Sequence, residues 1–289
     1  MSFANKHGIA EEKSRDQILR AVFPYPGGKG RLSQAFLDIL PYRDSYVEPF
    51  GGSGSVLLAR RKSKIEVFND RYAGVVAFYR CIRDAEKCRK LVERLDLTIH
   101  SREEFVWCRD TWEDQTDDVE RAARWYYTIN YSFSSLGRNF ARTTRCSEGN
   151  LAGKIRNKLK RFFMIHNRFQ RVQVENQDWL QCMKDYDSPV TVFYCDPPYL
   201  DSDSGIYKSK FKKEDHERLL HFIEHCEGYV AVSGYSHPLY EDCSFWNHRY
   251  EFDLRDSIKS LAFTESNHKK HQEGLNDRGR NQEVLWVKE

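Results

Sequence analysis

The feature that most constrains the fold is a series of short apolar segments separated by helical patterns. Seven segments are β-branched or aromatic and apolar enough to form buried strands: 45–48, 65–68, 172–174, 190–195, 229–233, 248–254 and 283–287. Strands that alternate with helices predict an α/β fold with a mixed, mostly parallel sheet of about seven strands. No clear helical pattern separates the last two segments, which favours an antiparallel hairpin at one edge.

One long region, residues 99–171, interrupts this alternation. It contains helical patterns and the loop-like stretch "SSLGRNFARTTRCSEGNLAG" (134–153), but no convincing strand. We therefore predict two parts: a catalytic domain made of residues 1–98 and 172–289, and an inserted, mainly helical subdomain at 99–171.

The insertion contains a block of basic residues. Between residues 136 and 171 the only acid is Glu148, whereas the whole chain has a net charge of just +3. The ten basic residues of this block are Arg138, Arg142, Arg145, Lys154, Arg156, Lys158, Lys160, Arg161, Arg168 and Arg171. A basic block on an otherwise acidic chain indicates a polyanionic partner, and the alternative is a solvated basic helix face.

Composition bears on location and on metals. No segment approaches the roughly 20 apolar residues of a membrane helix. Residues 1–17 lack the apolar core of a signal peptide, so we expect a cytoplasmic protein with no membrane association. The eight cysteines lack zinc-site spacing, which predicts reduced thiols. The H-x-x-E-H match at 221–225 has no clear third ligand, so we favour a surface helix without metal.

The first glycine-rich turn follows a predicted strand and opens a helix, in "YVEPFGGSGSVLL" (46–58). Glycines allow close approach of a ligand to the backbone, and a helix N-terminus offers N–H groups to a carboxylate or phosphate. Leu57 occupies the place of the third glycine in the dinucleotide motif. Asp70 ends the next strand, where an acid can bind ribose hydroxyls. Together these features predict a site for an adenosine-containing ligand.

A second glycine turn, "PYPGGKGRL" (24–32), is not a phosphate-binding P-loop. Phe23 stands where that motif needs a glycine, and Gly30 replaces its Ser or Thr. The alternatives for Lys29 are a solvated side chain at a helix-entry turn and a cation that binds a ligand carboxylate.

The segment "YCDPPY" (194–199) closes a buried strand abruptly. Two successive prolines remove two backbone donors and fix two φ angles, and each favours an extended residue before it. The strand therefore ends in a rigid shape that presents a carboxylate, Asp196, and an aromatic ring, Tyr199. This arrangement indicates a binding or catalytic cleft.

Four motifs in order, "PYPGGK", "VEPFGGSGS", "VFND" and "YCDPPY", with an insertion between the last two, resemble the D12-class DNA adenine-N6 methyltransferases. These are the Dam-type enzymes of the alpha group, and the resemblance spans about residues 22–288. It implies a Rossmann-like fold, S-adenosylmethionine as cofactor with S-adenosylhomocysteine as product, no metal, and double-stranded DNA as substrate. GATC, the commonest target in the family, is the starting hypothesis for the sequence methylated.

The resemblance also implies roles for individual residues. The cofactor-binding set comprises Tyr25, Lys29, Glu48, Pro49, Phe50, Gly51, Gly52, Ser53, Gly54, Ser55, Asp70, Asp178, Trp179, Asp196 and Tyr207. Within it Lys29 would lie near the cofactor carboxylate, 48–55 would wrap the methionine moiety, Asp70 would hold the ribose, and 178–179 would border the adenine. The catalytic set comprises Asp196, Pro197, Pro198 and Tyr199. The DNA-binding set comprises Asn130, Tyr131, Ser135, Arg138, Asn139, Arg142, Lys154 and Lys158.

The chemistry explains why such a motif suits an amino group. The lone pair of the adenine N6 nitrogen is delocalised into the ring, so the nitrogen is a poor nucleophile. Two acceptors, the Asp196 carboxylate and the Pro197 carbonyl, favour a pyramidal nitrogen with its lone pair directed at the methyl group. Tyr199 can stack on the base. The base must leave the duplex, and phosphate contacts from the basic insertion help offset that cost.

Other readings remain open. A cytosine-N4 methyltransferase uses a similar sheet and tetrapeptide, although serine is commoner than Asp196 there. RNA or protein-amide methylation is a weaker alternative, and a DNA-binding module with an inactive site is the alternative from another class. We take a monomer as the starting hypothesis. A cognate restriction nuclease, a solitary role and a phage-borne role all stay open.

Overall fold

The computed structural model describes residues 19–25, 28–30, 32–142, 150–200, 211–253 and 282–289. Its seven strands are β1 (Ser45–Glu48), β2 (Ile65–Asn69), β3 (Val172–Glu175), β4 (Thr191–Cys195), β5 (Tyr229–Gly234), β6 (His248–Asp253) and β7 (Gln282–Lys288). Every predicted strand is confirmed, with each end within one residue of its predicted position.

The strands form one sheet in the order β3-β2-β1-β4-β5-β7-β6. Strands β1 to β5 pair in parallel, whereas β7 runs antiparallel to both β5 and β6. The predicted mixed sheet and its antiparallel edge are confirmed. Because β7 runs the opposite way, its amino end lies at the same edge of the sheet as the carboxyl ends of β1, β2, β4 and β5. That edge carries the candidate site.

Helices cover both faces of the sheet, and side chains alternate between the faces. In β4, Val192 and Tyr194 belong to one apolar cluster, whereas Phe193 and Cys195 belong to the other. Helices of the first face are α2 (Ser33–Ile39), α3 (Ser55–Ala59) and α4 (Ala73–Arg83). Helices of the second face are α10 (Trp179–Tyr186), α11 (Lys213–His225) and α12 (Pro238–Glu241).

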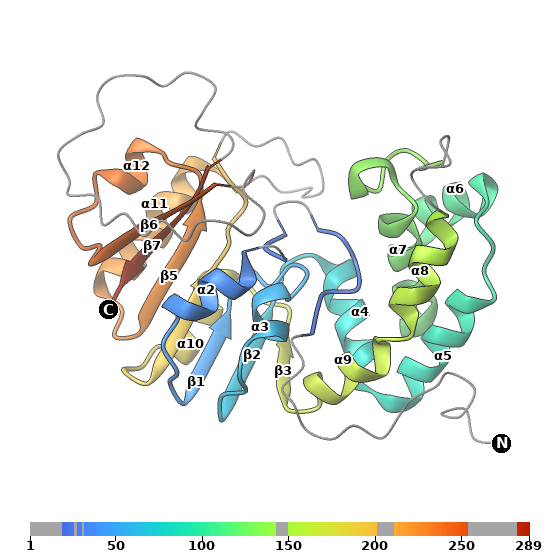
Figure 1. Cartoon of the computed structure of the whole chain (residues 1–289), viewed down its shortest axis with the longest axis horizontal. Helices are drawn as coiled ribbons and strands as arrows, with labels where there is room; N and C mark the ends of the chain where they lie inside the picture. The colour runs from blue at the N-terminus through green and yellow to red at the C-terminus, as the bar shows by residue number, and fades with distance from the viewer. Residues whose placement is uncertain (1–18, 26–27, 31, 143–149, 201–210, 254–281) are drawn as a thin grey trace.

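A helical unit lies beside β3 at one end of the sheet (Figure 1). Its elements are α5 (Ala85–Asp96), α6 (Arg102–Thr111), α7 (Asp118–Asn130), the 3₁₀ turn η1 (Phe133–Ser135), α8 (Leu151–Leu159) and α9 (Phe162–Phe169). Side chains of Asp84, Ser101, Asp117 and Asn150 cap the first turns of α5, α6, α7 and α8. Helix α7 packs against α4, α5 and α6, so helices on both sides of residue 98 share one layer. The predicted domain boundary at 98/99 stays a prediction.

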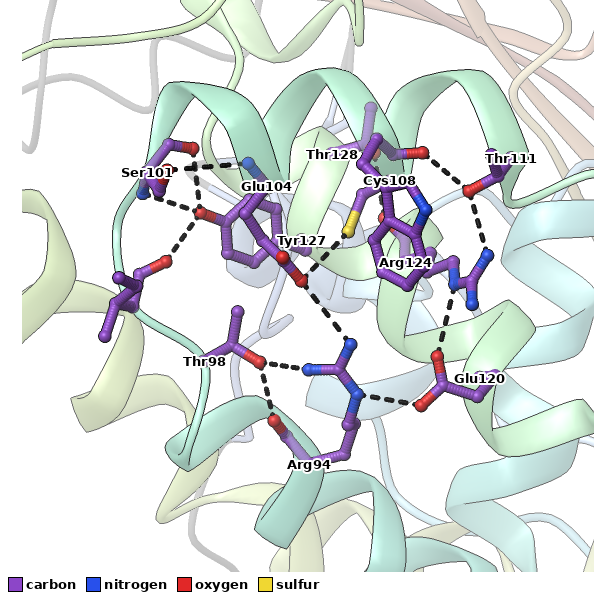
Figure 2. A network of polar contacts seen from close by, with 12 residues as sticks. Arg94, Thr98, Ser101, Glu104, Cys108, Thr111, Glu120, Arg124, Tyr127 and Thr128 are labelled. Atoms are coloured by element: carbon purple, nitrogen blue, oxygen red, sulfur yellow. Dashed lines mark hydrogen bonds and ion pairs between the residues drawn. The ribbon is translucent and has the colours of Figure 1, made fainter.

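A network of polar contacts connects three helices of this unit (Figure 2). Arg94 of α5 donates to Glu120 of α7 (2.7 Å) and to Glu104 of α6 (3.4 Å). Glu120 also accepts from Arg124 (3.1 Å), whose guanidinium reaches the Thr111 hydroxyl (2.9 Å). Shared, partly buried charges of this kind hold helices in register better than isolated surface pairs do.

A buried ion pair ties the helical unit to the sheet. Arg168 of α9 donates to both carboxylate oxygens of Glu66 on β2, at 2.5 and 2.7 Å, and to the Leu57 carbonyl at 2.8 Å. Arg168 is 6% exposed and Glu66 is 2% exposed. Arg168 was counted in the basic block predicted to meet a polyanion. That prediction is wrong for this residue, because its guanidinium is buried and both of its terminal nitrogens donate to Glu66.

Two further findings concern membrane-spanning helices and the cysteines. In the part of the chain that the structure describes, no helix is long and apolar enough to cross a membrane. The described cysteines, seven of the eight, are free thiols.

Candidate active site

A cavity of about 170 Å³ opens at the carboxyl edge of the sheet. It brings both glycine turns together with the segment that follows β4, which are far apart in the sequence. The lining residues are Tyr25, Gly28, Lys29, Glu48, Phe50, Gly51, Gly52, Ser53, Ser55, Val56, Tyr194, Asp196, Pro197, Pro198, Tyr199 and Tyr235. Most of the predicted cofactor-binding and catalytic residues therefore share one cavity.

The turn between β1 and α3 requires glycine at two positions. Gly52 has a φ of +51°, and a Cβ there would lie 2.9 Å from the Tyr25 ring. A Cβ on Gly51 would lie 2.3 Å from the Phe68 ring, which is closer than real Cβ contacts come. The absence of side chains lets the backbone form one wall of the cavity.

Asp70 holds the glycine turn in place through backbone hydrogen bonds. Its two carboxylate oxygens accept hydrogen bonds from the backbone of Gly52 and Tyr72, both at 2.7 Å. It is 3% exposed and does not line the cavity. Burial raises the pKa of Asp70 to about 6, and the two backbone N–H groups oppose this rise. Its predicted contact with a ribose stays a prediction.

Asn69, the residue before Asp70, has a role that sequence reasoning missed. Its amide donates to the Pro49 carbonyl (2.9 Å), and its oxygen accepts from the Gln177 backbone (2.9 Å). Asn69 therefore joins the glycine turn to the segment that follows β3. Its position at the end of a predicted strand was the available signal.

Glu48 ends β1 and is 1% exposed, although it lines the cavity. The Tyr46 hydroxyl donates to it at 2.7 Å. Burial raises the pKa of Glu48 to about 8, against the opposing effects of the Tyr46 hydroxyl, the Leu57 backbone and two arginines. Most Glu48 side chains are therefore protonated at neutral pH, ready to ionise if a cation binds beside them.

The two residues predicted to border the adenine, Asp178 and Trp179, do not line the cavity. Asp178 is exposed and caps α10 by accepting from the Leu180 backbone (3.0 Å). Trp179 is 4% exposed and stacks on Phe50, with ring centroids 5.8 Å apart. Phe50, rather than Trp179, faces the cavity. Tyr207 lies outside the described residues.

Asp196 is held by one of its two oxygens. Its Oδ1 accepts from the Lys29 ammonium (2.8 Å) and the Ser233 hydroxyl (3.0 Å), and the Tyr199 hydroxyl lies 3.3 Å away. Among the described residues, no donor reaches Oδ2. The carboxylate is thus fixed in orientation while one oxygen remains able to accept from a ligand, beside Pro197 and Pro198 in the cavity wall.

Lys29 lies at the centre of the polar contacts. It is 5% exposed, bonds to Asp196 and the Tyr199 hydroxyl, and lies 3.4 Å from Glu283. Burial acts to lower the pKa of Lys29, but the Asp196 and Glu283 carboxylates more than offset this and raise it. Its ammonium thus contacts two protein carboxylates. The predicted contact with a cofactor carboxylate stays a prediction.

Two residues of this cluster were not singled out from the sequence. Glu283, at the start of β7, is 3% exposed and accepts from the Tyr199 hydroxyl at 2.5 Å. Burial raises the pKa of Glu283 to about 7, while Lys29 opposes this and Asp196 adds to it. Tyr235, just after β5, packs edge-on against Tyr199 with ring centroids 4.6 Å apart. The only signal for Glu283 was an acid as the first residue of the predicted apolar strand 283–287.

The predicted DNA-binding residues separate into two groups. Arg138 and Asn139 are exposed on a loop that is closed by bonds from the Phe133 backbone to Asn139 (2.7 Å) and from the Ala141 backbone to Tyr131 (2.7 Å). Arg142 and Lys154 are also exposed, and Ser135 is partly exposed with a φ of +58°.

The second group is buried. The Asn130 amide donates to the Tyr126 carbonyl (2.9 Å) and accepts from Lys158 (2.7 Å). The Tyr131 ring stacks on His100, with centroids 4.4 Å apart, and is 5% exposed. The structure places Asn130 and Tyr131 inside the helical unit, so we leave both out of the proposed DNA surface. The partly exposed Lys158 stays in it.

The H-x-x-E-H match lies on α11. His221, Glu224 and His225 are exposed, and their ligand atoms lie within 4.8 Å of one another. They are not among the residues that line the cavity. The expectation of no metal stays a prediction.

Comparisons with known proteins find a matching family model and two similar methyltransferases. The model of the D12 class N6 adenine-specific DNA methyltransferases matches residues 25–268. The chain is 25% identical over 225 residues to the DNA N-6-adenine-methyltransferase of Escherichia phage P1, covering 73% of this chain but only 29% of the phage protein. It is 27% identical over 284 residues to the type II methyltransferase M1.LlaDCHI of Lactococcus lactis subsp. cremoris, covering 84% of this chain and 92% of the relative.

The sheet order, the glycine turn and the proline-rich strand end define a Rossmann-like methyltransferase. The match to the family model covers most of the chain. The protein therefore belongs to the D12 class of N6 adenine-specific DNA methyltransferases. The resemblance drawn from its four motifs is confirmed.

Proposed function

We propose that this protein transfers a methyl group from S-adenosylmethionine to the N6 amino group of adenine in double-stranded DNA, with the adenine flipped out of the helix. The observation that carries this proposal is the Asp196 carboxylate, fixed through Oδ1 at the wall of a cavity that the glycine turn also lines. GATC is the first target sequence to test. A monomer is the starting hypothesis, and a partner nuclease is a separate question.

The residues present fit the cofactor. Gly51 and Gly52 present backbone without side chains to the cavity, where a Cβ would collide with the Phe68 or Tyr25 ring, and the buried Glu48 can receive a positive charge. Phe50, backed by Trp179, offers an aromatic surface. When bound, S-adenosylmethionine supplies the methyl group as an electrophilic sulfonium. The residues proposed to hold it are Tyr25, Glu48, Phe50 and the turn 51–55.

The remaining wall acts on the target base. Asp196 Oδ2 and the Pro197 carbonyl accept the two N–H groups of the amine, which holds its lone pair out of conjugation with the ring. The Tyr199 ring, fixed through its hydroxyl by Lys29 and Glu283, stacks on the base, and Tyr235 borders it. Such stacking contributes about 1–3 kcal/mol per base.

The insertion, residues 99–171, is proposed to bind the duplex. Base flipping costs a few kcal/mol, and phosphate contacts offset it while they set the register. The exposed Arg138 and Asn139 suit hydrogen bonds to base edges, whereas Arg142, Lys154 and Lys158 suit phosphates.

The deciding experiment incubates purified protein with unmethylated DNA and S-adenosylmethionine, and analyses the nucleosides by mass spectrometry. N6-methyladenine is the expected product. N4-methylcytosine would keep the mechanism but change the base. Measurable cofactor binding without a methylated nucleoside would direct the search to RNA or protein substrates. Absence of both binding and product would favour an inactive DNA-binding module.

Cofactor binding is expected to release a proton near neutral pH. Glu48 has a pKa of about 8, so it is mostly protonated at pH 7. A cationic group placed beside it lowers that pKa, and the proton leaves. Calorimetric titration with S-adenosylhomocysteine, whose ammonium is the cation, should give enthalpies that differ between buffers of different ionisation enthalpy. The difference should correspond to up to about one proton released.

The control for this prediction is Glu48→Gln, which keeps the shape but cannot ionise. It should bind more weakly and show no buffer dependence. Equal enthalpies in both buffers for the unchanged protein would contradict a cationic group beside Glu48.

Two substitutions on the insertion should have different effects on DNA binding. Arg138→Ala should weaken binding to the target by about 1–3 kcal/mol and relax the preference at one base pair. Lys154→Ala should weaken binding to all duplexes similarly and lower the salt slope by about one. Fluorescence anisotropy on target and scrambled duplexes at several salt concentrations measures both. Identical behaviour of the two variants would refute the assignment of base and phosphate contacts.

A further inference from the structure

The strongest observation outside the predicted site is the position of Glu283. The last pair between β5 and β7 joins Gly234 to Val284, so Glu283 lies one residue beyond it, beside the carboxyl end of β5. Because β7 is antiparallel, this brings a residue from the end of the sequence to the cavity edge. There Glu283 Oε1 accepts from Tyr199 (2.5 Å) and lies 3.4 Å from the Lys29 ammonium.

The charges around Glu283 do not balance. Among the described residues, the partly exposed Asp196 and the buried Glu283 share one ammonium, Lys29. This cluster has a net charge of −1 when both acids are ionised. Within the described ranges, the other titratable groups that face it are the hydroxyls of Tyr194, Tyr199 and Tyr235, which are neutral at physiological pH.

The side chains of β6 that the structure describes add no charge to this cluster. Phe252 is the residue opposite Glu283, so it shares the same face of the sheet. The charged residues Arg249 and Glu251 pair with each other at 2.6 Å, and Glu251 lies opposite Val284 on the other face.

We propose that Glu283 is a positioning residue of the methyl-transfer site, which shares Lys29 with Asp196 and keeps the cluster negatively charged, so that it stabilises positive charge on the target nitrogen. This inference rests on the proposed function. It assigns a second carboxylate to the reaction, that of Glu283, which lies 84 residues after Tyr199 in the sequence.

The net charge of the cluster matters because methyl transfer moves positive charge to the target nitrogen. The nitrogen lone pair forms the new N–C bond, the S–C bond breaks with its electron pair left on sulfur, and the positive charge moves from sulfur to nitrogen. The nitrogen then loses one proton to Asp196 and from there to water. A charge of −1 beside the nitrogen favours this movement, whereas a neutral cluster does not.

The test compares Glu283→Gln with the unchanged protein in single-turnover methylation between pH 5.5 and 8.5. Glutamine keeps an acceptor for Tyr199 but carries no charge. Because the pKa of Glu283 is raised to about 7, its carboxyl is mostly protonated at low pH and ionised at high pH. The ratio of the two rates should approach one at pH 5.5 and rise to roughly five- to tenfold at pH 8.5. KM for DNA should change little.

A second measurement does not depend on activity. Carbon-13 NMR of glutamate carboxyl groups in the unliganded protein should show one resonance that titrates near pH 7 and is absent from Glu283→Gln. Thermal unfolding and S-adenosylhomocysteine binding confirm that the variant is folded. Glu251→Gln, on the neighbouring strand and the opposite face, is the matched control and should keep the pH profile.

The possible outcomes distinguish a failure of this inference from a failure of the proposed function. If the unchanged protein methylates no adenine, the proposed function fails. If it methylates adenine and the ratio stays near one at every pH, the role of Glu283 is refuted. A large ratio that does not vary with pH overturns the charge argument, because only shape would then matter.

Discussion

Replacement of Asp196 by alanine is expected to lower the single-turnover rate of adenine methylation by about 10²–10³-fold, the usual cost of removing one preorganised polar group at the reacting atom. The physical reason is that the variant loses the acceptor that Lys29 and Ser233 hold in place. Lys29 would then pair with Glu283 alone, and the cluster would no longer be negative. Quenched-flow assays on a short duplex, read by mass spectrometry, measure the rate.

Two controls define this result. Asp185→Ala removes an exposed acid from α10, outside the cavity, and should leave the rate unchanged. Binding of S-adenosylhomocysteine to Asp196→Ala should persist, because the glycine turn and Glu48 remain. A variant that binds this ligand and still methylates at the normal rate would rule out Asp196 as the acceptor.

Replacement of Arg168 by methionine is expected to lower the free energy of unfolding by about 3–5 kcal/mol. Glu66, 2% exposed, would keep a buried charge without its partner, and the Leu57 carbonyl would lose its donor. Urea denaturation followed by circular dichroism measures the loss. The salt dependence of DNA binding should not change, because Arg168 is buried.

The matched comparison is Arg156→Met. This arginine of α8 is exposed, and its Nε lies 3.5 Å from Asp96, so the change should cost no more than about 1 kcal/mol. The double variant Arg168→Met/Glu66→Leu should lose less stability than Arg168→Met alone, because no unpaired charge stays buried. Equal losses for Arg168→Met and Arg156→Met would show that the buried pair contributes nothing.

The sequence by itself determined the strands, the class of fold and the family. All seven strands were predicted within a residue at each end, because each is a short apolar run bounded by turn residues. The glycine turn and "YCDPPY" were recognisable because their geometry depends on local backbone chemistry. Gly52 needs a positive φ, and two prolines stop β4. Features that depend on local backbone chemistry can be recognised in the sequence without any knowledge of tertiary contacts.

Only the tertiary structure decided which charges pair with which. Arg168 looked like one more cation of a basic block, yet it pairs with Glu66 from a strand about 100 residues earlier. Asn130 and Tyr131 looked like DNA contacts, yet they are buried. Glu283 joined the site because β7 is antiparallel and returns to the carboxyl edge of the sheet. Burial and ion pairing depend on contacts between distant segments, and no local pattern in the sequence records them.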